Sequence, residues 1–224
     1  MLRTSVLVAG VMGAMAASAE ATFVTGARAF LTGAISTSNE SPGAAPGTFT
    51  ASVSSVSPAP VASASASLVW GATSYAFTGA ASGAVGSPLS TFANSQGIAM
   101  FTFATAMNVT MSWNLNSVTG TSSTALAGWS LDDVSSGITA YAIQFTGTST
   151  TPSSVTGGIS TTTSATGVTG QIAAGTYLLA TAIQIAAATS GNFTVNLTFT
   201  PVPTPGALPL IAVASLVARR GRRR

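Results

Sequence analysis

Two adjacent acids, Asp132 and Asp133, form the most chemically suggestive pair in this chain. Neighbouring carboxylates on a loop could supply oxygen ligands to Ca²⁺, which takes about six to eight, with serine, threonine and backbone oxygens completing the shell. The favoured alternative is a solvated turn in which an aspartate caps the backbone. Consecutive residues of a strand point to opposite faces, which is wrong for a glycosidase acid–base pair. We therefore predict no catalytic site here and no cofactor, with Asp132 and Asp133 as a calcium candidate only.

The residue types that are absent exclude most other chemistry. The chain has no histidine, no cysteine and no lysine. Catalytic triads, Cys–His pairs, Schiff bases and thiolate or imidazole metal sites cannot be built without them. Between residues 22 and 206 one arginine, Arg28, stands against three acids, a net charge of −2. That balance leaves no basic face for nucleic acid. The predicted protein is not an enzyme and not a nucleic-acid binder.

Three tryptophans could stack on sugar rings, as in carbohydrate-binding modules. Trp70 and Trp113 fall on the apolar side of alternating runs, so we expect both in the core. Trp129 stands close to the acidic pair and follows no such run. It is the predicted glycan contact, with core packing as the alternative.

The elements that must position these residues are strands. Polar and apolar residues alternate in four runs, which is typical of strands with one wet and one dry face: 48–54, 62–70, 108–116 and 192–200. Three further runs are apolar on both sides and should lie centrally in a sheet: 97–107, 137–147 and 175–187. Residues 36–60 form the loosest stretch, a long loop or an edge hairpin.

Many short strands between frequent turns predict an all-β fold. We expect an antiparallel, jelly-roll-like β-sandwich of about ten to twelve strands over residues 22–200. A β-solenoid would show a fixed sequence period, and none appears, so this fold is only the second choice. The wet sides of the strands consist of uncharged Thr, Ser and Asn, and no lysine guards the edges. We hypothesise that such a surface packs against polysaccharide or against its own copies.

The N-terminus resembles a secretory signal peptide, predicted as residues 1–21. Arg3 precedes an apolar stretch, and small residues, Ala17 and Ala19, stand at the −3 and −1 positions before Glu20. A second cut after Ala21 would use Ala19 and Ala21. The apolar stretch is too short for a membrane span, so cleavage is favoured over anchoring. We expect this segment to form a helix before removal.

The C-terminus, residues 201–224, has three parts in a fixed order. Prolines come first, in Val202-Pro203-Thr204-Pro205-Gly206, followed by an apolar segment that ends at residue 218 and is predicted as a short helix. The last part is a basic cluster made of Arg219, Arg220, Arg222, Arg223 and Arg224. The apolar segment would span about 20 Å, short of the ~30 Å hydrocarbon core, while the arginines would stay on the cytoplasmic side.

These three parts, together with the signal peptide, resemble the PEP-CTERM sorting signal of Gram-negative bacteria. Thr204 stands where the family's namesake motif has glutamate. The resemblance implies a transient stay in the inner membrane, processing by an exosortase-type transpeptidase, and delivery to the cell surface or extracellular matrix. The expected function is a structural or adhesive exported protein. The alternative is a carbohydrate-binding, lectin-like module, with an uncharacterised hydrolase third.

Overall fold

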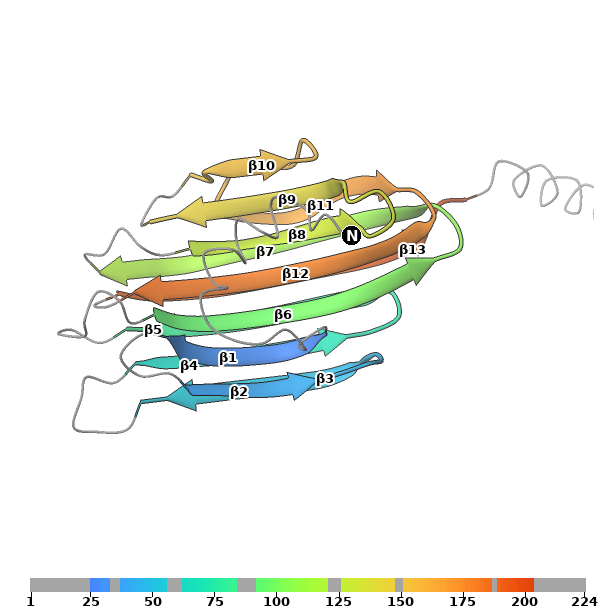
Figure 1. Cartoon of the computed structure of the whole chain (residues 1–224). Coiled ribbons are helices and arrows are strands. Elements are labelled where there is room, and N and C mark those ends of the chain that lie inside the picture. Colours follow the sequence, from blue (N-terminus) through green and yellow to red (C-terminus); the bar gives the residue numbers. More distant parts are fainter. Residues whose placement is uncertain are drawn as a thin grey trace, which may run out of the picture.

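The described part of the chain consists of two antiparallel β-sheets stacked face to face (Figure 1). The computed structural model describes residues 25–32, 37–55, 62–83, 92–120, 126–147, 151–186 and 189–203. Sheet A has seven strands in the order β10 (Ser154–Thr156), β9 (Thr139–Thr146), β8 (Leu126–Asp133), β12 (Gly175–Ala186), β6 (Phe92–Phe103), β1 (Gly26–Thr32) and β2 (Thr37–Pro42). Sheet B has six: β11 (Ser164–Ile172), β7 (Met107–Gly120), β13 (Thr189–Pro201), β5 (Ser74–Ser82), β4 (Ser63–Trp70) and β3 (Gly47–Ser54).

The alternating runs form strands of sheet B because every second side chain of a pleated strand reaches the core. In β4, Ala64, Ala66 and Leu68 are buried, whereas the serines between them are exposed or half-buried. Two of the three runs that are apolar on both sides lie centrally, as expected. Strands β6 and β12 lie in the middle of sheet A, whereas β9 is one strand from its edge.

The chain crosses repeatedly between the two layers. Strands β5, β6, β7 and β8 alternate between sheet B and sheet A. The late pair β12 and β13 is then inserted, with β12 between β6 and β8 and β13 between β5 and β7. Among the described strands, six of the eleven strand pairs join strands that are not consecutive in the chain, and the other five join consecutive strands.

One continuous core fills the space between the sheets. At one end aromatic rings gather, with Phe199 lying 4.8 Å, centroid to centroid, from both Phe101 and Phe103. Farther along, Trp113 of β7 meets Trp129 of β8 at 5.9 Å. Burial of these large apolar surfaces is the main force that holds the sheets together.

The all-β prediction with two antiparallel sheets is confirmed. The described residues hold thirteen strands, slightly more than the ten to twelve expected. Residues 36–60, expected as a long loop or an edge hairpin, instead contain β2 and β3, consecutive edge strands of different sheets that join the two layers at one side. The two predicted terminal helices lie outside the described residues. Within the described part, no helix has the length and apolarity required to cross a bilayer.

Candidate functional site

The outward surface of sheet B is the candidate site, and we call it the polar face. Register places the outward residues of its six strands side by side: Thr48, Thr50, Ser52 and Ser54; Ser63, Ser65, Ser67 and Val69; Ser74, Ala76, Thr78, Ala80 and Ser82; Ser190, Asn192, Thr194, Asn196, Thr198 and Thr200; Asn108, Thr110, Ser112, Asn114 and Asn116; Ser164, Thr169 and Gln171. None of these side chains is buried. None is ionisable, so the surface presents only hydroxyl, amide and methyl groups.

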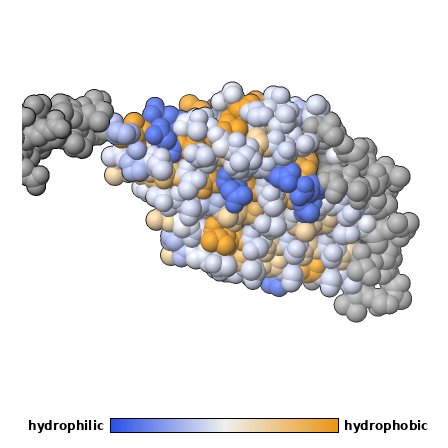
Figure 2. Space-filling model, turned by 180° about the vertical axis from the view of Figure 1, so that it is seen from behind, coloured by the Kyte–Doolittle hydropathy of each residue, from blue (hydrophilic) through white to orange (hydrophobic). Residues whose placement is uncertain are grey.

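Figure 2 views the molecule from this side, and pale colours of intermediate hydropathy cover most of it. A few side-chain amides pair with each other across or along strands. Asn114 Nδ2 donates to Asn116 Oδ1 at 2.9 Å, and Gln171 Nε2 donates to Asn108 Oδ1 at 3.4 Å. The polar face is therefore an ordered array of neutral hydrogen-bonding groups on a rigid sheet.

A shallow groove of about 500 Å³ crosses one end of the polar face. It runs over β3, β4, β5 and β13, perpendicular to the strands. Its lining consists of small residues and one amide: Ser52, Val53, Ser54, Ser63, Ala64, Ser65, Ala80, Ala81, Ser82, Ser190, Gly191 and Asn192.

The acidic pair does not converge on a common point. Asp132 is buried, and its two carboxylate oxygens accept hydrogen bonds from Ser130 Oγ at 2.9 Å and Thr139 Oγ1 at 2.5 Å. Its register partner is Leu178, on the outward side of sheet A. The sequence pattern gave no reason to expect Asp132 to be buried there. A calcium site built from both carboxylates is therefore wrong for this fold, because each points to its own hydroxyl donors.

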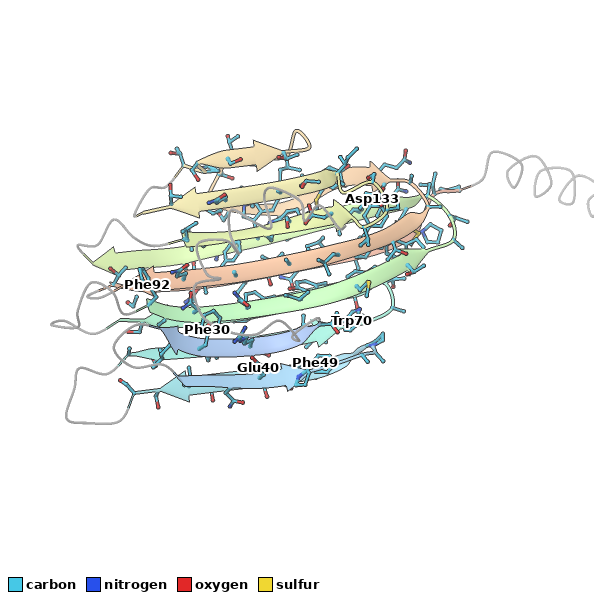
Figure 3. All side chains as sticks on the ribbon, viewed as in Figure 1. Phe30, Glu40, Phe49, Trp70, Phe92 and Asp133 are labelled. Atoms are coloured by element: carbon cyan, nitrogen blue, oxygen red, sulfur yellow. The ribbon has the colours of Figure 1, made fainter. Side chains whose placement is uncertain are left out.

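Asp133 caps the turn that joins β8 to β9 (labelled in Figure 3). Its Oδ1 accepts from the backbone nitrogen and the hydroxyl of Ser135 at 2.8 and 2.7 Å, and its Oδ2 accepts from Ser136 Oγ at 2.9 Å. These bonds, those of Ser135 first, lower the pKa of Asp133. The turn-cap interpretation is confirmed for Asp133. The described residues contain no cluster of three or more acidic, histidine or cysteine side chains that could hold a metal.

The glycan-contact prediction for Trp129 is corrected by its position. Only 2% of the side chain is exposed, and the ring packs on Trp113 in the core. Trp70 and Trp113 are buried as predicted. Trp129 was hard to place from sequence because β8 is buried on both faces and shows no alternation.

The outward side of sheet A differs from the polar face. Here Arg28 Nε and Glu40 Oε1 form an ion pair at 2.8 Å, and the guanidinium lies 4.7 Å from the centre of the Phe30 ring. On the adjoining strands Asn94 and Gln184 pair in register and are 1% and 5% exposed. Among the described residues, the Oδ1 of Asn94 and the Oε1 of Gln184 have no hydrogen-bond partner. This side is therefore buried in part and carries charges, whereas the polar face of sheet B is neutral and accessible.

Side chains of one sheet close the edges of the other. Tyr141 of β9 reaches edge strand β11, where its hydroxyl donates to Gln171 O at 3.0 Å and accepts from Gln171 N at 2.8 Å. On the opposite side Asn39 Nδ2 of β2 donates to Ser52 O of edge strand β3 at 3.0 Å. The sequence shows no lysine guard at either edge, and only the tertiary structure reveals these substitutes.

The predicted sorting motif begins where the described chain ends. The backbone nitrogen of Val202 donates to Ala106 O at 3.0 Å, and Pro203 is exposed. Thr204, Pro205, Gly206 and the arginines at 219, 220 and 222–224 lie outside the described residues, as do Ala17 and Ala19.

No protein-family model matches this chain, and no curated protein sequence matches it significantly.

Proposed function

We propose that this chain is an exported, non-enzymatic protein that acts structurally or adhesively at the cell surface or in the extracellular matrix. The observation that supports this most is the polar face, a sheet surface of neutral hydrogen-bonding groups without an ionisable side chain. Most soluble domains place interspersed charges on such a surface, and these discourage association. A face without them is suited to lasting contact with another neutral surface.

Neutral polysaccharide is the partner that such a face fits best. Hydroxyl groups both donate and accept hydrogen bonds, and so do the side chains of serine, threonine and asparagine. Contact between two uncharged hydroxylated surfaces requires no desolvation of ions and is little affected by salt. A second copy of the same face is the alternative neutral surface.

The sorting part of the proposal rests on the terminal segments. Their order of small-residue cleavage site, prolines, apolar run and arginine cluster supports export followed by exosortase-type processing, as in the PEP-CTERM family that they resemble. The inner membrane is then a transient partner of the precursor. Pro203 is exposed two residues after the end of β13, so this described part of the motif lies at the surface.

The proposal also includes two features of the fold of the precursor. The first is the jelly-roll-like class, supported by the insertion of β12 and β13 between earlier strands of both sheets. The second is a helix at each terminus of the precursor, supported by the two apolar segments.

A carbohydrate-binding, lectin-like module is the alternative function. The observation that favours it is the groove on the polar face, whose volume of about 500 Å³ lies within the ~300–1,000 Å³ of small-ligand sites. The buried Trp129 does not contribute to it.

The intact mass of the protein recovered from cells tests the proposal. We expect loss of the residues before Glu20 or Thr22 and of a C-terminal piece that includes all five terminal arginines. The matched control replaces those arginines with glutamine, which should leave an unprocessed precursor in the membrane fraction. Recovery of the full-length wild-type chain from the cytosol would refute export and the function built on it.

A further inference from the structure

We propose that the groove on the polar face binds an extended strand of neutral polysaccharide, lying across β3, β4, β5 and β13. This inference rests on the proposed function and names the partner of the same surface. The groove is formed by two rows of residues that register aligns across the four strands. One row is Ser54, Ser63, Ser82 and Ser190, and the other is Ser52, Ser65, Ala80 and Asn192.

Apart from Asn192, the side chains of these two rows are serines and one alanine, so most of them are small. The next row along the same strands is bulkier, with Thr50, Ser67, Thr78 and Thr194. The backbone of the four strands forms the floor of the groove. Val53, Ala64, Ala81 and Gly191 line the floor between the two rows. The strands are held rigidly by their ladders, so the groove is formed before any ligand arrives.

The lining selects for a neutral, hydroxylated ligand. No lining residue is ionisable, which disfavours phosphates, sulfated or carboxylated polymers and cations, since none would find a counter-charge. Serine hydroxyls can both donate and accept, and the Asn192 amide offers both functions at once. A sugar hydroxyl also donates and accepts hydrogen bonds, so it needs partners that can do both.

The spacing of the lining suits a polymer rather than a compact molecule. Adjacent strands lie about 4.8 Å apart, so four strands repeat their hydroxyl groups at regular steps over roughly 15 Å. An extended chain of pyranose units also repeats its hydroxyls at short, regular intervals along its length. Because the groove is shallow and runs perpendicular to the strands, an extended polymer can lie along it.

No aromatic side chain lines the groove, so ring stacking does not contribute to affinity. We therefore expect weak binding at a single groove. Firm attachment to a matrix would come from many copies that engage the same polymer. That behaviour is consistent with an adhesive protein.

The test fills the groove in the exported protein. Ser65→Phe places a ring in its centre, at an exposed strand position where aromatics are compatible with the sheet. Thr198→Phe puts the same ring on the polar face outside the groove, and it is the matched control. Binding to soluble β-glucan and dextran, with alginate as an anionic comparison, is measured by affinity electrophoresis, and thermal unfolding verifies that both variants fold.

We expect the unmodified protein to bind at least one neutral glucan and not to bind alginate. Ser65→Phe should weaken that binding about tenfold or more, and Thr198→Phe should leave it within about twofold. Equal weakening by both variants, or no effect of either, would show that the groove is not the binding site. The polar face would then remain as an adhesive surface. Preference for alginate would overturn the neutral-ligand inference.

The oligomeric state separates the remaining outcomes. If sedimentation shows a dimer that Ser65→Phe dissociates, and no glucan binds, a second copy occupies the groove and the inference is wrong. If the protein is matrix-associated yet binds no glucan, the groove inference fails and the proposed function survives. If the protein is not exported, the proposed function fails whatever the groove binds.

Discussion

Gly97 lies in the middle of β6, opposite two aromatic side chains of the other sheet. A Cβ atom at this position would come within 2.4 Å of Phe77 Cδ2 and 2.9 Å of the Tyr75 hydroxyl. That hydroxyl lies 3.0 Å from Gly97 O and 2.5 Å from Thr181 Oγ1, and burial raises the pKa of Tyr75, so it remains a neutral donor. The glycine is needed for close approach between the sheets.

We predict that Gly97→Ala destabilises the domain by about 1–3 kcal/mol, because the added methyl overpacks the core. Denaturant-induced unfolding measures the change. Gly175→Ala is the control, since its Cβ would meet nothing closer than Tyr177 Cε2 at 3.4 Å. It should change stability by no more than about 0.5 kcal/mol. Equal effects of the two substitutions would contradict this account of the core.

At the β8–β9 turn, Asp133 should make stability depend on pH in the acid range. Its folded-state pKa is lowered below the ordinary unfolded value of about 3.9, so the ionised form stabilises the turn. The stabilisation is complete above the unfolded pKa and disappears as pH falls through the folded pKa. We expect Asp133→Asn to flatten the loss of melting temperature below about pH 4, as measured by thermal scans. If the melting temperature of Asp133→Asn falls below pH 4 as steeply as that of the wild type, the Asp133 cap does not contribute to the stability of the fold.

At the scale of elements, side chains of sheet A rather than charges close the two edges of sheet B. The Tyr141 ring fits against edge strand β11 because glycines leave room for it. A Cβ atom at Gly170 would lie 2.3 Å from the Tyr141 hydroxyl, and one at Gly157 would lie 2.3 Å from its Cδ1. The hydroxyl then satisfies both backbone groups of Gln171, which would otherwise offer a template for another strand.

Tyr141→Phe should therefore cost about 1 kcal/mol and increase concentration-dependent association, because the backbone groups of Gln171 become available. Sedimentation and thermal unfolding measure the two effects. Tyr177→Phe removes a hydroxyl that donates to Ala173 O at 3.1 Å, outside edge strand β11, and should affect stability alone. Unchanged association of Tyr141→Phe would show that this edge is protected by other means.

At the scale of the whole molecule, the described domain has almost no electrostatic component. The side chains in it that are charged at neutral pH are Arg28, Glu40, Asp132 and Asp133, and the first two form an ion pair with each other. Hydrophobic burial and hydrogen bonding must then provide nearly all of its stability.

We accordingly expect the melting temperature to change by only a few degrees between about 0.1 and 1 M sodium chloride, since screening has little to act on. Sodium sulfate should raise it, because excluded salts strengthen apolar burial. Calorimetry on the exported protein measures both responses. A large change of the melting temperature at low sodium chloride concentration would mean that a charged interaction other than those of these four side chains stabilises the fold.

The sequence by itself predicted the class of fold and much of the polar face. Alternation along residues 108–116 and 192–200 showed which side chains are wet, because the pleat has a period of two and every strand obeys it locally. The absence of histidine, cysteine and lysine excluded most enzymatic and metal chemistry before any geometry was known. Burial of Trp70 and Trp113 followed from the same alternation.

Only the tertiary structure decided which strands become neighbours. Pairing of β13 with both β5 and β7 joins segments far apart in the sequence, and it converts separate polar stripes into one face with a groove. It also buried Trp129 and Asp132 and brought Tyr141 to a strand edge. Periodicity is a local property of the chain, whereas register between distant strands depends on how side chains from both sheets fill one core.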